Sequence, residues 1–345
     1  VCVVGGVPSP RFLRLWIFVT AGWGHPAHSR TIPSMMPDQR LNIIGELMNN
    51  SYARARKAFT DRSVKDYQNL ARIQAGLGVR YLTLNLDGTA RIQVKMEEML
   101  AFLPEVIAGI QEVTSVPISF DNPSIKYHQL ALEHYDRTKS GPPILNSVAA
   151  SRDRLDEMTE LVAAYDTNVI VMASEHFVPG GTAQCLCATD THAAARQFVE
   201  LLVTKAGRRP DQIIVDTGLA PVGADTYGLV NIGLDAMRLI RGDADLQGVH
   251  LMVGLSNFAW GTPRGVREQL ENAYLTLGMA AGLDYALANP EKSPGPLPPD
   301  HPMVGRLREA LEQGRAGEGE TQEPAGSSPA AAHMAICADA APVDW

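Results

Sequence analysis

Cysteine and aromatic residues are scarce in this chain of 345 residues, and each scarcity excludes a class of protein. There are four cysteines, of which two lie near the chain ends and two, Cys185 and Cys187, are too close together to cross-link a fold. A disulfide scaffold is therefore excluded, and a reducing cytoplasm is the expected location. Aromatic residues make up 6% of the chain, which argues against a platform on which nucleic-acid bases stack.

Positive charge and long apolar runs are scarce as well. The net charge of −8 argues against a nucleic-acid partner. The apolar run within residues 11–20 is too short to span a membrane, so no membrane partner is expected. We interpret residues 1–39 as a disordered or spurious extension, because Met35 and Met36 lie just before the first expected strand. The alternative is a weak signal peptide, since arginines flank the apolar run.

What the chain does contain is one repeated pattern, an apolar run that ends abruptly in a small polar residue. Runs that are apolar throughout suit parallel strands covered on both faces. A stretch with helical periodicity follows each of them, and alternating strands and helices indicate an α/β domain with a parallel sheet. The pattern occurs at residues 82–85, 118–121, 144–147, 213–216 and 249–257.

Three further strands bring the total to eight, which predicts a closed (β/α)₈ TIM barrel formed by one domain over residues 40–313. The loop expected at 174–189, after the fifth strand, is long, and long loops in such folds are usually functional. Residues 314–345 are rich in Gly, Ala, Glu, Ser and Pro and are expected to form a disordered tail. The expected strands are 41–45, 81–86, 116–120, one beginning at 143–145, 168–173, 212–215, 249–253 and 283–287.

Five polar residues stand where expected strands end, and in parallel α/β folds ligands bind at those ends. They should converge on one pocket that holds amides and two carboxylates but no nucleophile. Each also has a purely structural interpretation: the aspartates as helix N-caps, the first two asparagines as partners of loop backbone, the last as a turn residue. We favour ligand binding for all but the first, for which the two interpretations are even. The five are Asn85, Asp121, Asn146, Asp216 and Asn257.

With these motifs in place, residues 42–289 resemble the pterin-binding TIM-barrel superfamily. This superfamily includes the methyltetrahydrofolate:corrinoid methyltransferases, the folate domain of cobalamin-dependent methionine synthase, and dihydropteroate synthase. Each motif alone is weak, whereas all of them in order, each at a strand end, are fairly specific. They are Ile44-Gly45-Glu46-Leu47-Met48-Asn49, Leu84-Asn85, Phe120-Asp121, Leu145-Asn146-Ser147, Val215-Asp216 with Pro221, and Gly254-Leu255-Ser256-Asn257.

The sequence is more similar to the methyltransferase branch than to dihydropteroate synthase. Dihydropteroate synthases carry a lysine near the sixth strand and Ser-Arg-Lys after the seventh, where this chain has Ala220-Pro221-Val222 and Ser256-Asn257-Phe258. The cations that would meet a pyrophosphate leaving group are therefore missing. The chain departs from the methyltransferases after the fifth strand, where Met172-Ala173 replaces their Met-Asn pair.

The resemblance assigns roles to individual residues. It implies that Asp121, Asn146 and Asp216 hold the pterin ring and that Asn257 is the catalytic residue, hydrogen-bonded near N5 of the folate. Asn85 and Ser256 would be further folate contacts, and Glu46 would support these residues without touching the ligand. The chemistry agrees, since carboxylates suit the N–H donors of an aminopyrimidine. An amide can also favour the charge that develops at N5 during methyl transfer.

We therefore expect a methyltransferase of one-carbon metabolism that moves a methyl group between N5 of tetrahydrofolate and the cobalt of a corrinoid. The substrate would be tetrahydrofolate or 5-methyltetrahydrofolate, in a direction that the sequence does not specify. The chain lacks an Asp-x-His-x-x-Gly motif, so the cobalamin, which carries the difficult chemistry, would come from a separate corrinoid protein. The alternatives are a dihydropteroate synthase-like condensing enzyme and a folate-binding protein without catalysis.

Two further expectations concern assembly and metal binding. A homodimer is expected because family members are commonly dimeric. No metal is expected in this chain, since the Cys-x-Cys spacing is poor for a single zinc ion. The residues that could be considered for zinc are His176, Cys185, Cys187 and His192.

Overall fold

Eight parallel strands close into a barrel in the computed structural model, which describes residues 40–151, 155–225 and 227–315. Neighbouring strands pair in the order β1-β10-β9-β8-β5-β4-β3-β2, and β10 pairs with β1 to close the ring. The prediction of a TIM barrel is thereby confirmed. The strands are β1 (Asn42–Asn49), β2 (Tyr81–Asn85), β3 (Ile118–Asp121), β4 (Ile144–Ala149), β5 (Asn168–Met172), β8 (Ile213–Asp216), β9 (His250–Gly254) and β10 (Tyr285–Ala288).

The apolar runs form strands here because both of their faces are buried. In β4 all six residues are buried, as expected for a strand with the barrel interior on one side and helices on the other. A cluster of inward-facing residues from seven strands fills the barrel, so the interior is a packed core. Its members are Ile44, Tyr81, Ile144, Ile170, Ile214, Met252 and Tyr285.

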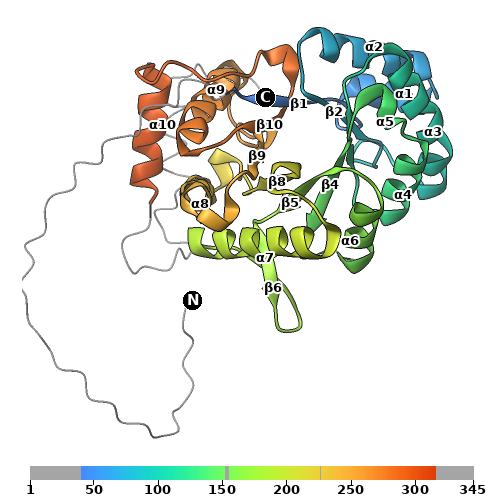
Figure 1. Ribbon diagram of the computed structural model, residues 1–345. Coiled ribbons are helices and arrows are strands. Elements are labelled where there is room, and N and C mark those ends of the chain that lie inside the picture. Colours follow the sequence, from blue (N-terminus) through green and yellow to red (C-terminus); the bar gives the residue numbers. More distant parts are fainter. Residues whose placement is uncertain (1–39, 152–154, 226, 316–345) are drawn as a thin grey trace, which may run out of the picture. The chain divides into compact units, whose positions relative to one another are not determined.

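Helices surround the barrel as an outer ring (Figure 1). A helix lies between consecutive barrel strands, as the sequence pattern predicted, and two short helices, α1 and α5, were not predicted. They are α1 (Ala53–Thr60), α2 (Val64–Gly76), α3 (Met96–Val113), α4 (Ile125–His134), α5 (Arg137–Ser140), α6 (Leu155–Ala164), α7 (Ala188–Ala206), α8 (Leu229–Gly242), α9 (Arg264–Ala281) and α10 (Pro302–Gln313). Ser124 occupies the N-cap position of α4, but its side chain makes no capping hydrogen bond there.

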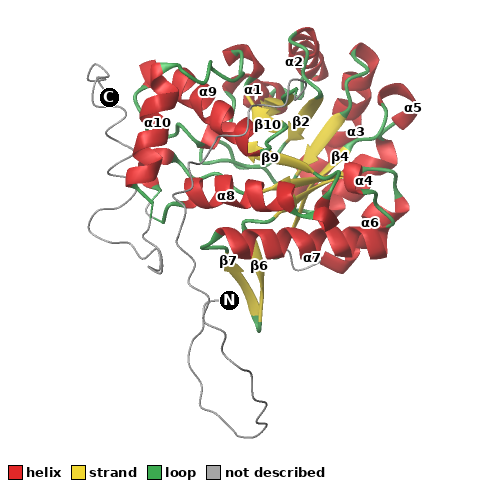
Figure 2. Cartoon of the chain, turned by 60° about the vertical axis from the view of Figure 1, so that its left-hand side comes forward, coloured by secondary structure: helices red, strands yellow, loops and turns green. Residues whose placement is uncertain are grey.

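The segment after β5 differs from the long loop that the sequence predicted. It contains an antiparallel hairpin, β6 (Glu175–Val178) paired with β7 (Gly181–Gln184), which projects beyond the ring of helices (Figure 2). Only Pro179 and Gly180 separate the two strands, and Gly180 has a φ of +87°, which glycine adopts without steric cost. The expectation of a long loop was wrong for these residues. A turn of two residues brings the flanking residues close enough to pair as antiparallel strands.

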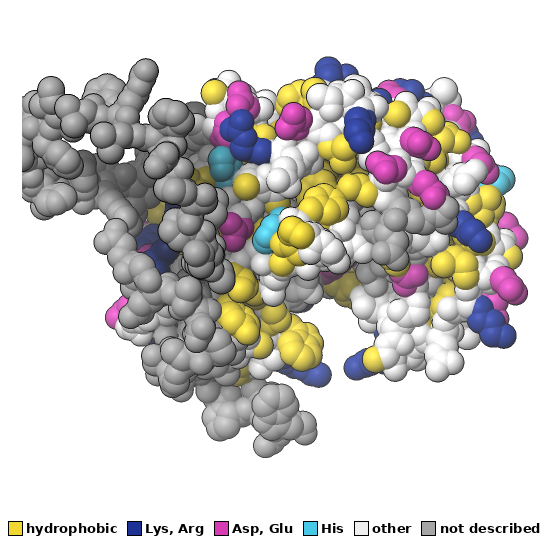
Figure 3. Space-filling model, turned by 90° about the horizontal axis from the view of Figure 1, so that it is seen from below, with side chains coloured by type: hydrophobic (Ala, Val, Ile, Leu, Met, Phe, Trp, Pro, Cys, Tyr) yellow, Lys and Arg dark blue, Asp and Glu magenta, His cyan; other side chains and the backbone are white. Residues whose placement is uncertain are grey.

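Other expectations concern the ends and the surface of the chain. The expected extension over residues 1–39 and nearly all of the expected tail lie outside the described residues. Within the described part, no helix combines the length and the apolar character needed to cross a membrane. Figure 3 shows one face of the molecule, on which acidic and basic side chains are interspersed among hydrophobic ones rather than gathered by sign.

Candidate functional site

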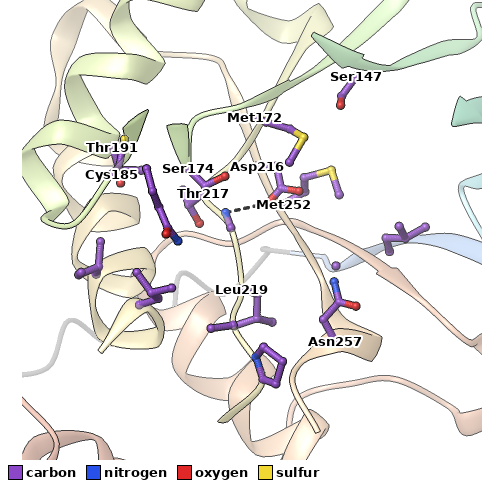
Figure 4. Close-up of a pocket in the computed structure, with 18 of the residues that line it drawn as sticks. Ser147, Met172, Ser174, Cys185, Thr191, Asp216, Thr217, Leu219, Met252 and Asn257 are labelled. Atoms are coloured by element: carbon purple, nitrogen blue, oxygen red, sulfur yellow. Dashed lines mark hydrogen bonds between the residues drawn. The ribbon is translucent and has the colours of Figure 1, made fainter. Parts of the chain in front are cut away.

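A pocket of about 560 Å³ opens at the carboxyl ends of the barrel strands. Residues at the ends of β3, β4, β5, β8, β9 and β10 line it (Figure 4). Four of the residues expected to converge do so, and each contributes a polar side chain: Asp121, Asn146, Asp216 and Asn257. Their roles toward a ligand stay predictions, but their common location fits a molecule that presents several N–H groups along one edge.

Asn85 lies behind Asp121 instead of lining the pocket. Its Nδ2 donates to Oδ2 of Asp121 at 3.1 Å, and its Oδ1 accepts from the backbone N–H of Asp87 at 2.9 Å. Hydrogen bonds thus fix both the nitrogen and the oxygen of the Asn85 amide, and the nitrogen holds one oxygen of the Asp121 carboxylate. This geometry favours an orienting role for Asn85 rather than the direct folate contact that the sequence suggested.

Asp216 ends β8 and is the central carboxylate of the pocket. Its Oδ1 accepts from the backbone N–H of Gly218 at 2.8 Å, the bond drawn as a dashed line in Figure 4. Burial raises the pKa of Asp216 to about 6, and the bond from Gly218 offsets only part of this effect. Next to it, the buried Oγ1 of Thr217 has no hydrogen-bond partner among the described residues. A ligand with N–H groups could donate to the Asp216 carboxylate.

Asn257 closes the opposite side of the pocket. It ends a single 3₁₀ turn, η4 (Leu255–Asn257), that follows β9 directly. A Cβ atom at Gly254 would lie 3.1 Å from Nδ2 of Asn257, so the amide packs directly over this glycine. Asn257 is also exposed, which leaves its amide accessible from the mouth of the barrel. A group held over it could be reached by a second reactant from outside.

Ser256 and Glu46 form a buried contact beside the pocket. The Ser256 hydroxyl donates to Oε1 of Glu46, and the Tyr52 hydroxyl donates to the same oxygen. Glu46 is only 7% exposed. Burial raises the pKa of the Glu46 carboxyl, while the two hydroxyls and the charge of Lys292 act in the opposite direction. Ser256 is therefore turned toward Glu46, and its predicted contact with folate stays a prediction.

The sequence analysis missed several residues that line the pocket. Ser147 and Thr217 directly follow predicted residues, so the strand ends could have indicated them. Gln184 and Cys185 come from the base of the β6–β7 hairpin. The feature of the sequence that pointed to them was the length of the segment after the fifth strand. Met172 and Met252 provide apolar surface between the polar groups.

The side chains considered for zinc are engaged separately. Sγ of Cys185 lies 3.4 Å from Nδ1 of His176, whereas Nε2 of His192 lies 2.6 Å from Oδ2 of Asp243. Burial raises the pKa of the Cys185 thiol to about 12, which favours the neutral form. Across the described ranges, no group of three or more His, Cys, Asp or Glu side chains is arranged to hold a metal ion.

Comparison with solved structures shows the same fold. Dihydropteroate synthase from Vibrio fischeri ES114 shares 16% identity and a TM-score of 0.52, over 74% of this chain and 89% of that chain. The Yersinia pestis enzyme with a pterine-sulfa conjugate shares 15% identity and a TM-score of 0.53, over 74% and 91%. The Coxiella burnetii enzyme in complex with pteroic acid shares 18% identity and a TM-score of 0.51, over 74% and 89%.

The comparison with protein families is more specific than the fold. The pterin binding enzyme family matches residues 49–289, a range that runs from the end of β1 to just beyond β10 and includes every polar residue of the pocket named above. On this match, the chain belongs to the family of pterin binding enzymes.

Proposed function

We propose that this protein transfers a methyl group between N5 of tetrahydrofolate and the cobalt of a corrinoid held by a separate protein. The observation that carries the proposal is the composition of the pocket. Two carboxylates and two amides, Asp121, Asp216, Asn146 and Asn257, line one cavity. Among the described residues that line it, there is no lysine or arginine.

The carboxylates account for recognition of the pterin. The aminopyrimidine edge of a pterin is mostly a row of N–H donors, and an ionised carboxylate is the strongest acceptor a protein offers. The pKa of about 6 for Asp216 leaves this side chain ionised at pH 7 to 8. Hydrogen bonds from the ligand would then compensate for the hydration that this charged group loses in a partly buried site.

Asn257 accounts for the reacting end. N5 is a poor leaving group unless it gains a proton or a hydrogen bond in the transition state. An amide at this position can turn its oxygen toward a protonated N5, so that it stabilises charge only as the charge develops. When bound, a corrinoid would supply a Co(I) nucleophile, and the exposure of Asn257 fits approach of a second protein from the barrel mouth.

A condensing reaction like that of dihydropteroate synthase is the second candidate, because the solved structures with the same fold carry that name. Such a reaction expels pyrophosphate, a leaving group that calls for lysine or arginine close to the reacting carbon. The lining of the pocket supplies no such group in the described part of the chain, which favours methyl transfer. A cytoplasmic location and a homodimer belong to the proposal as further expectations.

The test is a spectroscopic assay with two substrate pairs. The purified protein is mixed with 5-methyltetrahydrofolate and reduced cob(I)alamin, and the loss of the Co(I) absorption band is followed. In parallel, 6-hydroxymethyl-7,8-dihydropterin pyrophosphate and p-aminobenzoate are supplied, and 7,8-dihydropteroate is measured. We expect conversion with the first pair only. Formation of dihydropteroate would establish the second candidate, and folate binding without any conversion would indicate a binding protein.

The first prediction concerns Asn257. Asn257→Ala should lower kcat about 10²- to 10³-fold, the range seen when one transition-state donor is removed, and should leave KM nearly unchanged. Asn69→Ala is the matched control, because Asn69 is exposed on α2 and its oxygen contacts Arg72. A kcat of Asn257→Ala equal to that of the control would remove Asn257 from the mechanism.

A further inference from the structure

We propose that Glu46 is a positioning residue, which holds Asn257 over the pocket through the hydroxyl of Ser256. This inference rests on the proposed function, since it concerns how that function's catalytic amide is oriented. It adds a residue from β1 to a site that is otherwise built from the ends of β3 to β10.

The path of β1 explains how Glu46 reaches the turn after β9. In the pairing of β1 with β2, Gly45 aligns with Leu82 and Met48 with Leu84, so β1 has an additional residue between them. Such a bulge bends a strand and re-aims its side chains. In the barrel, β10 lies between β1 and β9. The Glu46 side chain therefore spans the width of one strand to accept the hydrogen bond of Ser256.

Backbone hydrogen bonds also hold the turn that carries Asn257. Within η4, Phe258 N–H donates to the Leu255 carbonyl at 3.0 Å. Downstream, Trp260 N–H donates to the Asn257 carbonyl at 3.2 Å, and Val222 N–H donates to the Phe258 carbonyl at 2.8 Å. These bonds hold the backbone and do not fix the rotation of the Asn257 side chain. The bond from Ser256 to Glu46 ties the preceding residue to β1 and so restricts the turn from the barrel side.

A second buried carboxylate shows what an ordinary satisfied glutamate looks like in this protein. Glu271 on α9 is 5% exposed, and both of its oxygens accept from Nζ of Lys292 at 3.3 Å. Glu46 is buried to a similar extent but accepts from two hydroxyls, of which one belongs to the residue before Asn257. Burying a carboxylate costs free energy unless its partners are well placed. If residue 46 served packing alone, a neutral side chain would fill the same space at a lower cost in free energy.

Kinetic measurements with isosteric variants test the role. Glu46→Gln keeps the shape but weakens the acceptor, and Ser256→Ala removes the donor. Each should lower kcat about 10-fold with KM changed less than twofold, because a small misplacement of a reacting group affects the transition state more than binding. In a double-mutant cycle, the combined variant should lose no more than the worse single variant. Glu309→Gln on α10 is the control and should keep the wild-type kcat, because Glu309 is exposed and its Oε1 contacts Gln313.

A second measurement is independent of turnover. The side-chain amide signals of Asn257 in a ¹⁵N-labelled sample can be assigned by their absence in Asn257→Ala. We expect them to shift or broaden in Glu46→Gln and Ser256→Ala, and to stay in place in Glu309→Gln. Thermal melting of all variants checks that each remains folded.

The outcomes separate this inference from the proposed function. If wild-type protein turns over and Glu46→Gln and Ser256→Ala keep its kcat, the positioning role is wrong and the methyltransferase stands. Additive losses in the double variant would also overturn it, since the two residues would then act separately. If the wild type shows no methyl transfer, the proposed function fails. The Asn257 amide signals then decide alone, and unchanged signals in Glu46→Gln overturn the role.

Discussion

At the scale of single residues, some side chains of the pocket lower the free energy of unfolding of the ligand-free protein. Asp216 is held in a site that raises the pKa of its carboxyl from 3.8 to about 6, mainly because the charged form loses solvation there. The buried hydroxyl of Thr217 beside it has no partner in the part of the chain that the structure describes. Binding sites commonly carry such unfavourable groups, because the ligand that satisfies them gains affinity from them.

This cost gives a pH-dependent prediction for Asp216→Asn in the absence of ligand. A carboxyl whose folded pKa is raised destabilises the protein above that pKa, and the destabilisation disappears below the unfolded value of 3.8. The substitution should therefore increase the free energy of unfolding by about 2–3 kcal/mol at pH 7.5. The gain should shrink as the pH falls from about 6 toward 4, as measured by urea unfolding across this range. A gain that did not depend on pH would contradict the assigned cause.

Gly254 provides a second prediction at the residue scale. Its φ of −80° is open to any residue, but a Cβ there would come within 3.1 Å of the Asn257 amide. Gly254→Ala should therefore displace the amide by a few tenths of an ångström and lower kcat about 10-fold. The melting temperature should change little. Gly305→Ala on α10 is a suitable control, since a Cβ there meets no atom within 4 Å. A full kcat in Gly254→Ala would mean that the amide tolerates displacement.

At the scale of elements, the serines that precede two helices differ in whether their side chains cap the helix. Ser63 precedes α2 and its side chain accepts from the backbone N–H of Asp66 at 3.2 Å. Ser124 holds the same position before α4 without such a bond. Ser63→Ala should cost about 1 kcal/mol of unfolding free energy, and Ser124→Ala should cost only a few tenths. Equal losses in chemical denaturation would show that the side-chain cap at α2 contributes nothing.

For the whole molecule, ligand binding should be visible as stabilisation of the barrel. Residues from six strands line the pocket, so a pterin bound there, as proposed, would contact elements distributed around most of the closed sheet. At a ligand concentration of 100 times Kd, the expected gain is about 2.7 kcal/mol, equivalent to a rise in Tm of about 5 °C.

The choice of ligand and variant makes this last prediction specific. 5-Methyltetrahydrofolate should raise Tm in the wild type and in Asn257→Ala, because the proposed role of Asn257 is at the reacting end. The shift should be much smaller in Asp216→Asn, which lacks the central acceptor. No shift in the wild type at millimolar folate would contradict a folate site in this pocket.

Much of the fold could be predicted from the sequence, for a local reason. A strand buried on both faces is largely apolar, so runs such as residues 213–215 are visible without any knowledge of their neighbours. The hairpin β6–β7 was missed because none of its strand residues is buried, so no long apolar run reveals the strands. The helix α1 was missed because it has only eight residues, too few for a clear period.

The sequence by itself determined which polar residues end parallel strands, because that pattern is local, and parallel strands place their carboxyl ends at one edge. Only the tertiary structure decided which of them face the pocket. Asp121, Asn146, Asp216 and Asn257 line it, whereas Asn85 is turned toward Asp121 and Ser256 toward Glu46. The physical reason is that a side chain's direction at a strand end depends on the register and bulges of neighbouring strands. These are contacts between segments far apart in the sequence.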